Sequence, residues 1–365
     1  MKKRTILLPV FFALVPAAYL SLWPVPIEPV AWQAPSAPGY AGVHAVNSKL
    51  AGVHNIDLRG EVGPEHVVFG ADGMLYTGVA SGKILRMRPD GGGQEVFCDT
   101  GGRPLGMAFD AAGRLIVADA IKGLLSVGAD GKVTVLADAL DGAPLRFLDG
   151  VVVAKSGKVY FTDASTRFGP AQWGGTLEAA MLDVLEQSAT GRVLEYDPAG
   201  KALRAVARGL GFANGIALSA DEGSLFVNES GKYRVWKIAV AAEQLDVAQP
   251  SAQARVLLDN LPGYPDNLLR GLDGRIWLGL AGQRNDLDKM AGRPFLRKLM
   301  LRVPRPLWPT PKLYGHLIAF DEDGRVLADL QDPSGASPLT TGATETAQRL
   351  YIHNADGKSL GWLAR

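Results

Sequence analysis

The chain has 365 residues, of which 47% are apolar and 21% charged, and its formal net charge is +1. A chain so nearly neutral gives no reason to expect nucleic acid as a partner, and we expect none. Cys98 is the only cysteine, which excludes an intramolecular disulfide, a cysteine-based zinc site and a Cys-x-x-Cys redox motif. Glycine is in excess, at 44 residues or about 12% against a usual ~7%, and it follows no Gly-X-Y period. This composition predicts a turn-rich, all-β protein.

The N-terminus has the layout of a signal anchor or a signal peptide. A basic start, Lys2-Lys3-Arg4, precedes an uncharged apolar run over residues 6–23. Length does not separate the two, because a membrane span needs ~17–25 residues. We favour an uncleaved membrane anchor over residues 1–25, and cleavage stays open. Basic residues before the run keep the N-terminus in the cytoplasm, which places the remainder in the periplasm or another extracytoplasmic space.

Residues 26–54 are rich in proline and are predicted to form a stiff, extended stalk. After them a repeat begins. Each copy has an apolar stretch, a polar residue with a glycine that suits a tight hairpin turn, and an alternating strand. The first turn glycines, Gly73, Gly113 and Gly157, are 40 and 44 residues apart, and a four-stranded propeller blade takes ~40–50 residues.

Six such hairpins, each followed by a further short strand, predict a six-bladed β-propeller over residues 55–365. A strand near residues 53–58 is expected to close the ring by pairing with the last blade. The competing fold is a β-sandwich, whose strands would not come in fourfold sets at this period.

Two insertions interrupt the repeat, near residues 164–190 and 281–314, and both are predicted to be lids. The second is basic, with eight Arg and Lys residues against two Asp between Arg284 and Lys312. Such a segment could contact anionic lipid. We favour the alternative, a solvated lid over the mouth of the propeller.

In four of the predicted inner strands, a polar residue lies two positions before the apolar part of the strand. These four residues are Glu65, Asp149, Asn214 and Asp266. Any one alone is most simply an ordinary turn residue. Four at equivalent places in a ring of blades converge on its axis, where three carboxylates and an amide provide the oxygen ligands that Ca²⁺ prefers. We therefore predict a metal site formed by these four residues.

Several segments resemble the strictosidine-synthase-like branch of the gluconolactonase / senescence-marker-protein superfamily, over roughly residues 55–365. They are 147–153, 159–165, 212–219, 227–235 and 260–267. The N-terminal layout is similar to that of the adipocyte plasma-membrane-associated protein subgroup. The resemblance implies a six-bladed propeller with a divalent cation, usually Ca²⁺, held by Glu65, Asn214 and Asp266. The family's additional Asn falls on Asp149, so this chain departs from the pattern with a further carboxylate.

Lactonase members of this family use the cation as a Lewis acid and a carboxylate to activate water. The resemblance thus implies a Ca²⁺-dependent hydrolase of small-molecule esters or lactones, with Asp266, or else Asp149, as the catalytic carboxylate. One alternative is amine–aldehyde condensation, which strictosidine synthases perform with a glutamate near the last blade. The nearest acid here is Glu345. The other alternative is a non-catalytic propeller that binds a ligand at its mouth.

Other residues carry weaker expectations. His316 is either a base lining the mouth or, as we favour, structural, and His66 adjoins the predicted ligand Glu65. Asp163 and Glu229 are expected to support the site from behind its ligands. The serines show no Gly-x-Ser-x-Gly elbow, so a serine hydrolase mechanism is not supported.

Overall fold

The computed structural model describes residues 17–308 and 312–365. Most of the predicted signal anchor, residues 1–25, lies outside the described residues. Within the part that is described, none of the helices combines the length and the apolar character that crossing a membrane requires.

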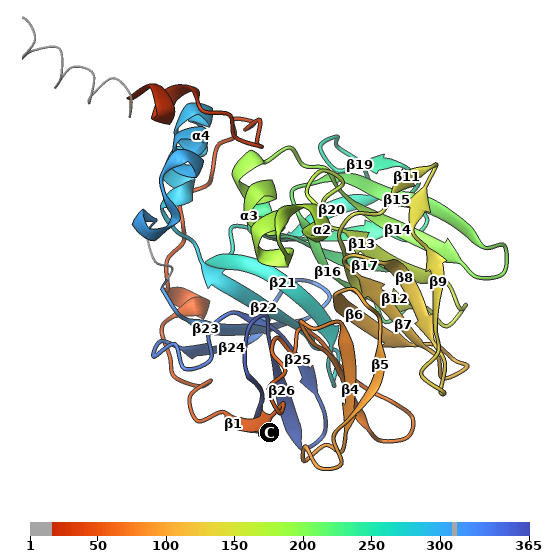
Figure 1. Ribbon diagram of the computed structural model, residues 1–365. Coiled ribbons are helices and arrows are strands. Elements are labelled where there is room, and N and C mark those ends of the chain that lie inside the picture. The colour runs from red at the N-terminus through yellow and green to blue at the C-terminus, as the bar shows by residue number, and fades with distance from the viewer. Residues whose placement is uncertain (1–16, 309–311) are drawn as a thin grey trace, which may run out of the picture.

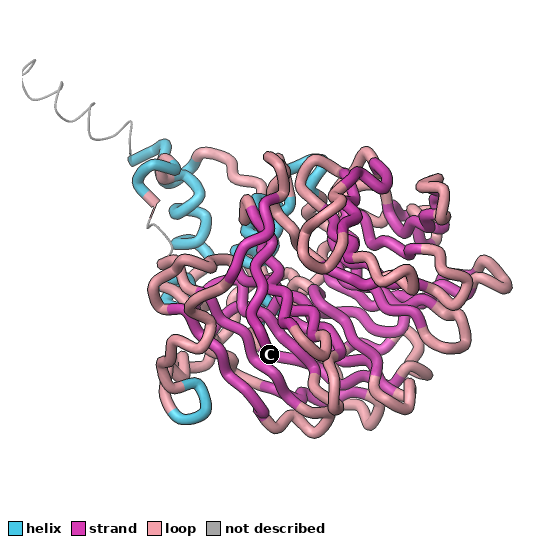
Figure 2. Tube along the Cα trace, turned by 90° about the horizontal axis from the view of Figure 1, so that it is seen from below, coloured by secondary structure: helices cyan, strands magenta, loops and turns pink. Residues whose placement is uncertain are grey.

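The described residues form a six-bladed β-propeller, as predicted (Figures 1 and 2). Each blade contains four antiparallel strands, and the first of them in the chain is the innermost. In the last blade, the outermost strand comes from the N-terminal side of the propeller. Blades 1 to 3 contain β2 (Val67–Phe69), β3 (Leu75–Gly78), β4 (Lys83–Met87) and β5 (Glu95–Asp99); β6 (Pro104–Phe109), β7 (Leu115–Asp119), β8 (Gly123–Val127) and β9 (Val133–Ala137); and β12 (Leu148–Val153), β13 (Val159–Asp163), β14 (Gly191–Asp197) and β15 (Ala202–Leu210).

Blades 4 to 6 follow the same plan. They contain β16 (Ala213–Leu218), β17 (Ser224–Glu229), β18 (Arg234–Ala239) and β20 (Ala254–Leu258); β21 (Gly263–Arg270), β22 (Ile276–Gln283), β23 (Gly315–Phe320) and β24 (Val326–Asp332); and β25 (Thr340–Glu345), β26 (Arg349–Asn354), β27 (Ser359–Ala364) and β1 (His54–Asp57). The short strand β19 (Leu245–Asp246) adds to blade 3, and β10 (Ala139–Leu140) pairs with β11 (Ala143–Pro144).

The ring is closed by β1, as predicted. It pairs antiparallel with β27, with His54 opposite Trp362 and Asp57 opposite Ser359. Ile56 and Leu58 are buried with Leu360 and with core residues of blade 1. The two ends of the propeller are therefore joined by both backbone hydrogen bonds and a shared apolar core.

Both predicted insertions carry helices at one end of the propeller (Figure 1). The first holds α2 (Pro170–Trp173) and α3 (Thr176–Glu186), and the second holds η3 (Asp286–Met290), α4 (Pro294–Arg302) and η4 (Arg305–Leu307). We call these two insertions, together with residues 17–32, the cap. Leu182 and Leu185 of α3, Met300 and Leu301 of α4 and Ile27 belong to one apolar cluster, so the cap is a single packed unit.

The proline-rich segment expected to be a stalk lies against the propeller instead of standing free from it. Ile27 is fully buried, and the backbone N–H of Val30 donates to Glu186 O at 2.8 Å. Further along, a short 3-10 helix, η1 (Gly42–His44), lies against β24, and Leu50 is fully buried between blades 5 and 6. The segment is extended but is part of the folded body.

The basic residues of the second insertion hold the cap together. Arg297 donates to the carbonyls of Leu185 and Val30, and Arg302 donates to those of Trp23 and Leu20. Other members form ion pairs: Arg284 with Asp288, Lys289 with Asp286, Lys298 with Glu28, and Arg305 with Glu178. This internal use of the positive charges agrees with a lid over the mouth and leaves few of them for lipid.

A buried carboxyl group makes the cap sensitive to pH. Asp183 of α3 is 1% exposed, and neither of its oxygens has a hydrogen-bond partner among the described residues. Burial, reinforced by the neighbouring Glu186, raises the pKa of Asp183 to about 7. Because the folded state binds this proton more tightly, the stabilisation is complete below the ordinary pKa of ~4 and is lost as pH rises to about 7.

We therefore expect the melting temperature to fall between pH 5 and 7.5 by more in the native protein than in Asp183→Asn, which cannot ionise. Three pKa units correspond to at most about 4 kcal/mol. Glu178→Gln is the matched control, because Glu178 lies exposed on the same helix. Differential scanning fluorimetry across pH measures this, and parallel pH curves for the native protein and Asp183→Asn would contradict it.

Candidate functional site

The four predicted ligands occupy equivalent positions near the starts of four innermost strands. In blades 2 to 6 the pairing between the first and second strands shifts register at this point. The equivalent residues, from blade 1 to blade 6, are Glu65, Leu105, Asp149, Asn214, Asp266 and Thr341. We call them the axial residues. Blades 1, 3, 4 and 5 thus contribute polar oxygen ligands.

The close approach of neighbouring inner strands explains why glycine follows several axial residues. A Cβ added to Gly150 would lie 2.9 Å from the backbone nitrogen of Ile216 in the next blade. At Gly215 it would lie 2.3 Å from that of Leu268. Since no side chain fits these gaps, the Asp149-Gly150 and Asn214-Gly215 pairs let the strands converge and bring the axial side chains together.

The three axial carboxyl groups interact electrostatically although they come from different blades. Glu65 and Asp149 are buried, and Asp266 is partly buried. Burial, together with the negative charges of Glu65 and Asp149, raises the pKa of Asp266 well above its usual range. Burial and the charge of Glu65 do the same for Asp149. The three groups are therefore close enough for the charge of one to affect the ionisation of another.

Arg103 is the cation that faces these carboxyl groups. Its Nη2 lies 3.3 Å from Glu65 Oε2, and Nη1 donates to the carbonyl of Gly63 at 3.3 Å. The guanidinium is buried, and its charge opposes the rise in the pKa of Glu65 and Asp149 that burial causes. When all three carboxyl groups are ionised, the single arginine leaves two negative charges uncompensated, which a divalent cation would balance.

Asn214 provides a separate indication that the site fits a cation. Its Oδ1 is buried and has no hydrogen-bond partner among the described residues. Its backbone is held in place, because Thr162 Oγ1 donates to the carbonyl of Asn214 at 2.6 Å and accepts from the N–H of Gly150 at 2.9 Å. A fixed, unpaired carbonyl oxygen beside carboxylates is a suitable Ca²⁺ ligand.

The oxygens of the three axial carboxyl groups are farther apart than ligands of one ion would be. Among the described residues, Glu65, Asp149 and Asp266 do not form a trio whose oxygens all lie within 4.8 Å of each other. Ligands on opposite sides of Ca²⁺ are about 4.8 Å apart, given bonds of ~2.4 Å. Direct coordination by all three would draw these side chains inward.

His66, which follows Glu65 in the chain, is a buried, neutral histidine whose ring accepts a hydrogen bond from the next blade. The backbone N–H of Met107 donates to His66 Nδ1 at 3.0 Å, so the proton of the neutral ring sits on Nε2. Burial lowers the pKa of His66 to about 4. His353 of β26 lies beside it, with ring centroids 5.5 Å apart, and burial lowers its pKa as well.

Asp163 and Glu229 lie behind the site, where they hold the segments that lead into the inner strands. Asp163 Oδ1 accepts the N–H of Phe147 at 3.1 Å, and Glu229 Oε1 accepts that of Gly211 at 2.9 Å. Asp119 does the same for Arg103, at 3.0 Å. In each of three successive blades, one carboxylate thus holds the backbone just before, or at, the start of the inner strand.

Two sequence candidates lie away from the axis. Glu345 ends β25, four residues or ~13 Å along the strand from the axial Thr341. There it pairs with Arg275 at 3.2 Å and Arg365 at 2.9 Å. His316 lies on β23, the third strand of blade 5, and contacts Asp329. The structure places neither residue at the mouth.

The cap packs onto the same end of the propeller as the axial residues. The axial Leu105 and the residues two positions before Asp149 and Asn214, Phe147 and Phe212, belong to the apolar cluster that contains Ile27 and α3. Neither Arg103 nor Ile27 was identified from the sequence. A buried arginine carries no periodic signal, and Ile27 lies in a segment read as a spacer.

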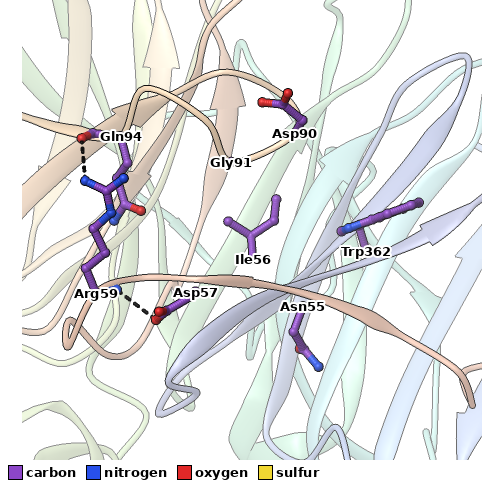
Figure 3. Close-up of a pocket in the computed structure, with 8 residues that line it drawn as sticks. All are labelled: Asn55, Ile56, Asp57, Arg59, Asp90, Gly91, Gln94 and Trp362. Carbon is purple, nitrogen blue, oxygen red and sulfur yellow. Dashed lines mark hydrogen bonds between the residues drawn. The ribbon is translucent and has the colours of Figure 1, made fainter.

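One cavity of the described structure lies away from the axis. A pocket of about 300 Å³ lies where the ring closes, between the outer strands of blade 6 and the turn after β4 in blade 1 (Figure 3). Its lining residues are Asn55, Ile56, Asp57, Arg59, Asp90, Gly91, Gln94 and Trp362. It contains none of the axial residues, so it is not the predicted site.

Comparisons of the sequence with known proteins show the family to which the chain belongs. Residues 42–87 match the strictosidine synthase-like N-terminal family, and residues 66–287 match the SMP-30/gluconolactonase/LRE-like region. Strictosidine synthase-like 7 of Arabidopsis thaliana is 36% identical over 271 residues, which cover 72% of this chain and 67% of the relative. The adipocyte plasma membrane-associated protein of Danio rerio is 31% identical over 352 residues, 90% of this chain and 81% of the relative.

Solved structures share the fold. A gluconolactonase from Xanthomonas campestris aligns with a TM-score of 0.58 and 20% identity over 93% of this chain and 98% of its own. A calcium-binding protein, regucalcin, from Agrobacterium tumefaciens aligns with a TM-score of 0.58 and 15% identity over 85% and 93%. The chain therefore belongs to the SMP-30/gluconolactonase/LRE-like family and is similar, within it, to the strictosidine synthase-like proteins.

Proposed function

We propose that the protein is a Ca²⁺-dependent hydrolase of small-molecule esters or lactones. The observation that carries the proposal is the axial set, in which three carboxyl groups and an unpaired amide oxygen face one arginine. Relatives of the same fold that are described as a gluconolactonase and as a calcium-binding protein support it. Glu65, Asp149, Asn214 and Asp266 are the residues that would hold the ion.

The chemistry follows from the axial residues. A bound cation would polarise the ester carbonyl. With a cation bound, Asp266 would take a proton from the attacking water, and the acyl C–O bond would then break as the proton passes to the leaving alcohol. Asp149 is the second candidate for this role. His66 Nε2–H is a neutral donor beside the site, suited to an oxygen that gains negative charge.

The alternative of amine–aldehyde condensation lacks its catalyst in this chain. Glu345, the acid expected to perform it, is held by two arginines at the other end of the inner strand. The second alternative, a non-catalytic propeller, keeps the cation site without turnover, so activity measurements separate it from the hydrolase.

We expect Asp266→Asn to reduce hydrolysis of aryl esters or lactones by at least 100-fold, because the amide cannot accept the proton from water. Removing Ca²⁺ with a chelator should abolish the activity, and adding it back should restore it. Glu345→Gln is the control, an acid on an inner strand away from the axis. A panel of aryl esters and lactones provides the measurement. Activity that survives both Asp266→Asn and chelation would refute the proposal.

Cation binding can be tested without a substrate. We expect Ca²⁺ to raise the melting temperature of the protein, because it relieves repulsion among the axial carboxylates. Asn214→Ala and Asp149→Asn should weaken binding by 10-fold or more, measured by calorimetric titration. Binding at native affinity by both variants would show that the ion, if any, lies elsewhere. Tight binding without turnover of any ester or lactone would favour the ligand-binding propeller.

We also propose that residues 1–25 anchor the protein to a membrane, with the propeller in the periplasm or another extracytoplasmic space. The basic start and apolar run support this, and so do Leu22 and Trp23, which are 77% and 59% exposed where the described chain begins. Figure 1 shows the first described residues, from residue 17 on, lying across the end of α4.

The full chain should sediment with membranes and resist carbonate extraction. A C-terminal tag should be digested by protease added from the extracytoplasmic side, because the N-terminus stays in the cytoplasm. A tag protected from that protease, or full-length protein in the soluble cytoplasmic fraction, would contradict the proposed localisation.

A further inference from the structure

A second cluster of ligand-type side chains lies on the outer half of blade 5, away from the axis. His44 comes from η1, His316 from β23 and Asp329 from β24. Their ligand atoms all lie within 4.8 Å of one another, and in the described part of the chain no other trio of His, Cys, Asp or Glu meets that criterion. Three elements distant in sequence thus present two imidazoles and a carboxylate to one point.

The carboxylate of Asp329 is the centre of the cluster. Its Oδ2 lies 2.7 Å from His44 Nδ1 and 2.9 Å from His316 Nε2. Its Oδ1 accepts hydrogen bonds from Asn47 Nδ2 at 3.2 Å and Gln331 Nε2 at 2.5 Å. One oxygen is therefore fixed by amides, while the other faces the two imidazoles.

An outer layer of contacts orients these groups. Tyr314 Oη donates to Gln331 Oε1 at 2.6 Å, which turns the amide nitrogen of Gln331 toward Asp329. The ring of Tyr40 covers His316, with centroids 5.6 Å apart. Metal ligands in proteins are commonly held by hydrogen-bonded neighbours of this kind.

The cluster is shielded from water but already charged. His316 is 1% exposed and Asp329 6%, and the side chain of His44 is 14% exposed. Although burial alone would raise the pKa of Asp329, hydrogen bonds from His316 and His44 hold it below its usual range.

We propose that His44, His316 and Asp329 bind a Zn²⁺ ion, or a transition-metal ion of similar preference, that fastens the N-terminal segment to blade 5. Two imidazoles and a carboxylate are a zinc donor set with one position left for water, whereas the axial residues offer oxygen alone. Zinc bonds of 2.0–2.2 Å put tetrahedral ligands ~3.4 Å apart. The two contacts to Asp329 Oδ2, at 2.7 and 2.9 Å, would need to lengthen by about 0.5–0.7 Å.

The position of His44 gives the ion a structural role. The chain before it runs along the propeller to Trp32, which packs against the core of blades 4 and 5, and to Ile27, which packs in the cap. The chain after it leads to the fully buried Leu50 and the closing strand β1. A metal at His44 would therefore hold the segment that links the cap to the ring closure, independently of the axial site.

The full chain, freed of metal by chelation and dialysed, is titrated with Zn²⁺ and, for its visible spectrum, with Co²⁺. We expect about one zinc per chain by elemental analysis and the intense absorption of low-coordinate Co²⁺. His44→Gln and Asp329→Asn should each weaken binding by 100-fold or more. His44→Cys, which restores a donor at the same place, should recover most of it. Protease should cut between residues 33 and 48 more slowly when zinc is bound.

Two controls separate this site from others. His54→Gln removes an exposed histidine that stacks on Trp362 outside the cluster, and it should bind zinc normally. Asp149→Asn should also bind zinc normally, even if it loses Ca²⁺, so failure of one proposed site is distinguishable from failure of the other. A folded native chain that binds no zinc at micromolar concentration, or variants at His44 and Asp329 that bind it as the native chain does, would overturn the proposal. The trio would then be a hydrogen-bonded tie alone.

Discussion

The axis of the propeller depends on how closely the inner strands approach one another. Gly150 and Gly215 leave no room for a Cβ, because the backbone of the next blade occupies that space. This packing brings Glu65, Asp149 and Asp266 into one region, where each makes ionisation of the others harder. Packing between blades therefore creates an electrostatic strain that Arg103 relieves only in part, and a divalent cation is the simplest agent to relieve the remainder.

The cap turns an open end of the propeller into an enclosed one. Its apolar cluster includes Leu105 at the axis and Phe147 beside it, so residues of the mouth and the lid share one core. The arginines of the second insertion bind backbone carbonyls of the N-terminal segment, which pins that segment beneath α4. The buried carboxyl of Asp183, whose pKa burial raises to about 7, lies on α3 within this cap.

Features that repeat along the chain could be predicted, and features made by single contacts could not. Six blades, the closing strand and the equivalent places of four polar residues follow from a period of turns and from one offset before each strand. Arg103 gives no such signal, because its role depends on the space beside Gly63, where a Cβ would lie 3.0 Å from its Nη2. The proline-rich segment is extended as expected, but the pockets that hold Ile27 and Leu50 come from distant parts of the chain.

The same distinction applies to His316, for which the sequence favoured a structural role over that of a base lining the mouth, without indicating its partners. Its partners, His44 and Asp329, come from an N-terminal segment and from the edge strand of its own blade, and only the folded chain brings them together. The resulting cluster contains nitrogen ligands, while the axial set contains oxygen alone. Because Ca²⁺ prefers oxygen and Zn²⁺ accepts imidazole, the two proposed sites, one at the axis and one on blade 5, would bind their ions with little competition between them.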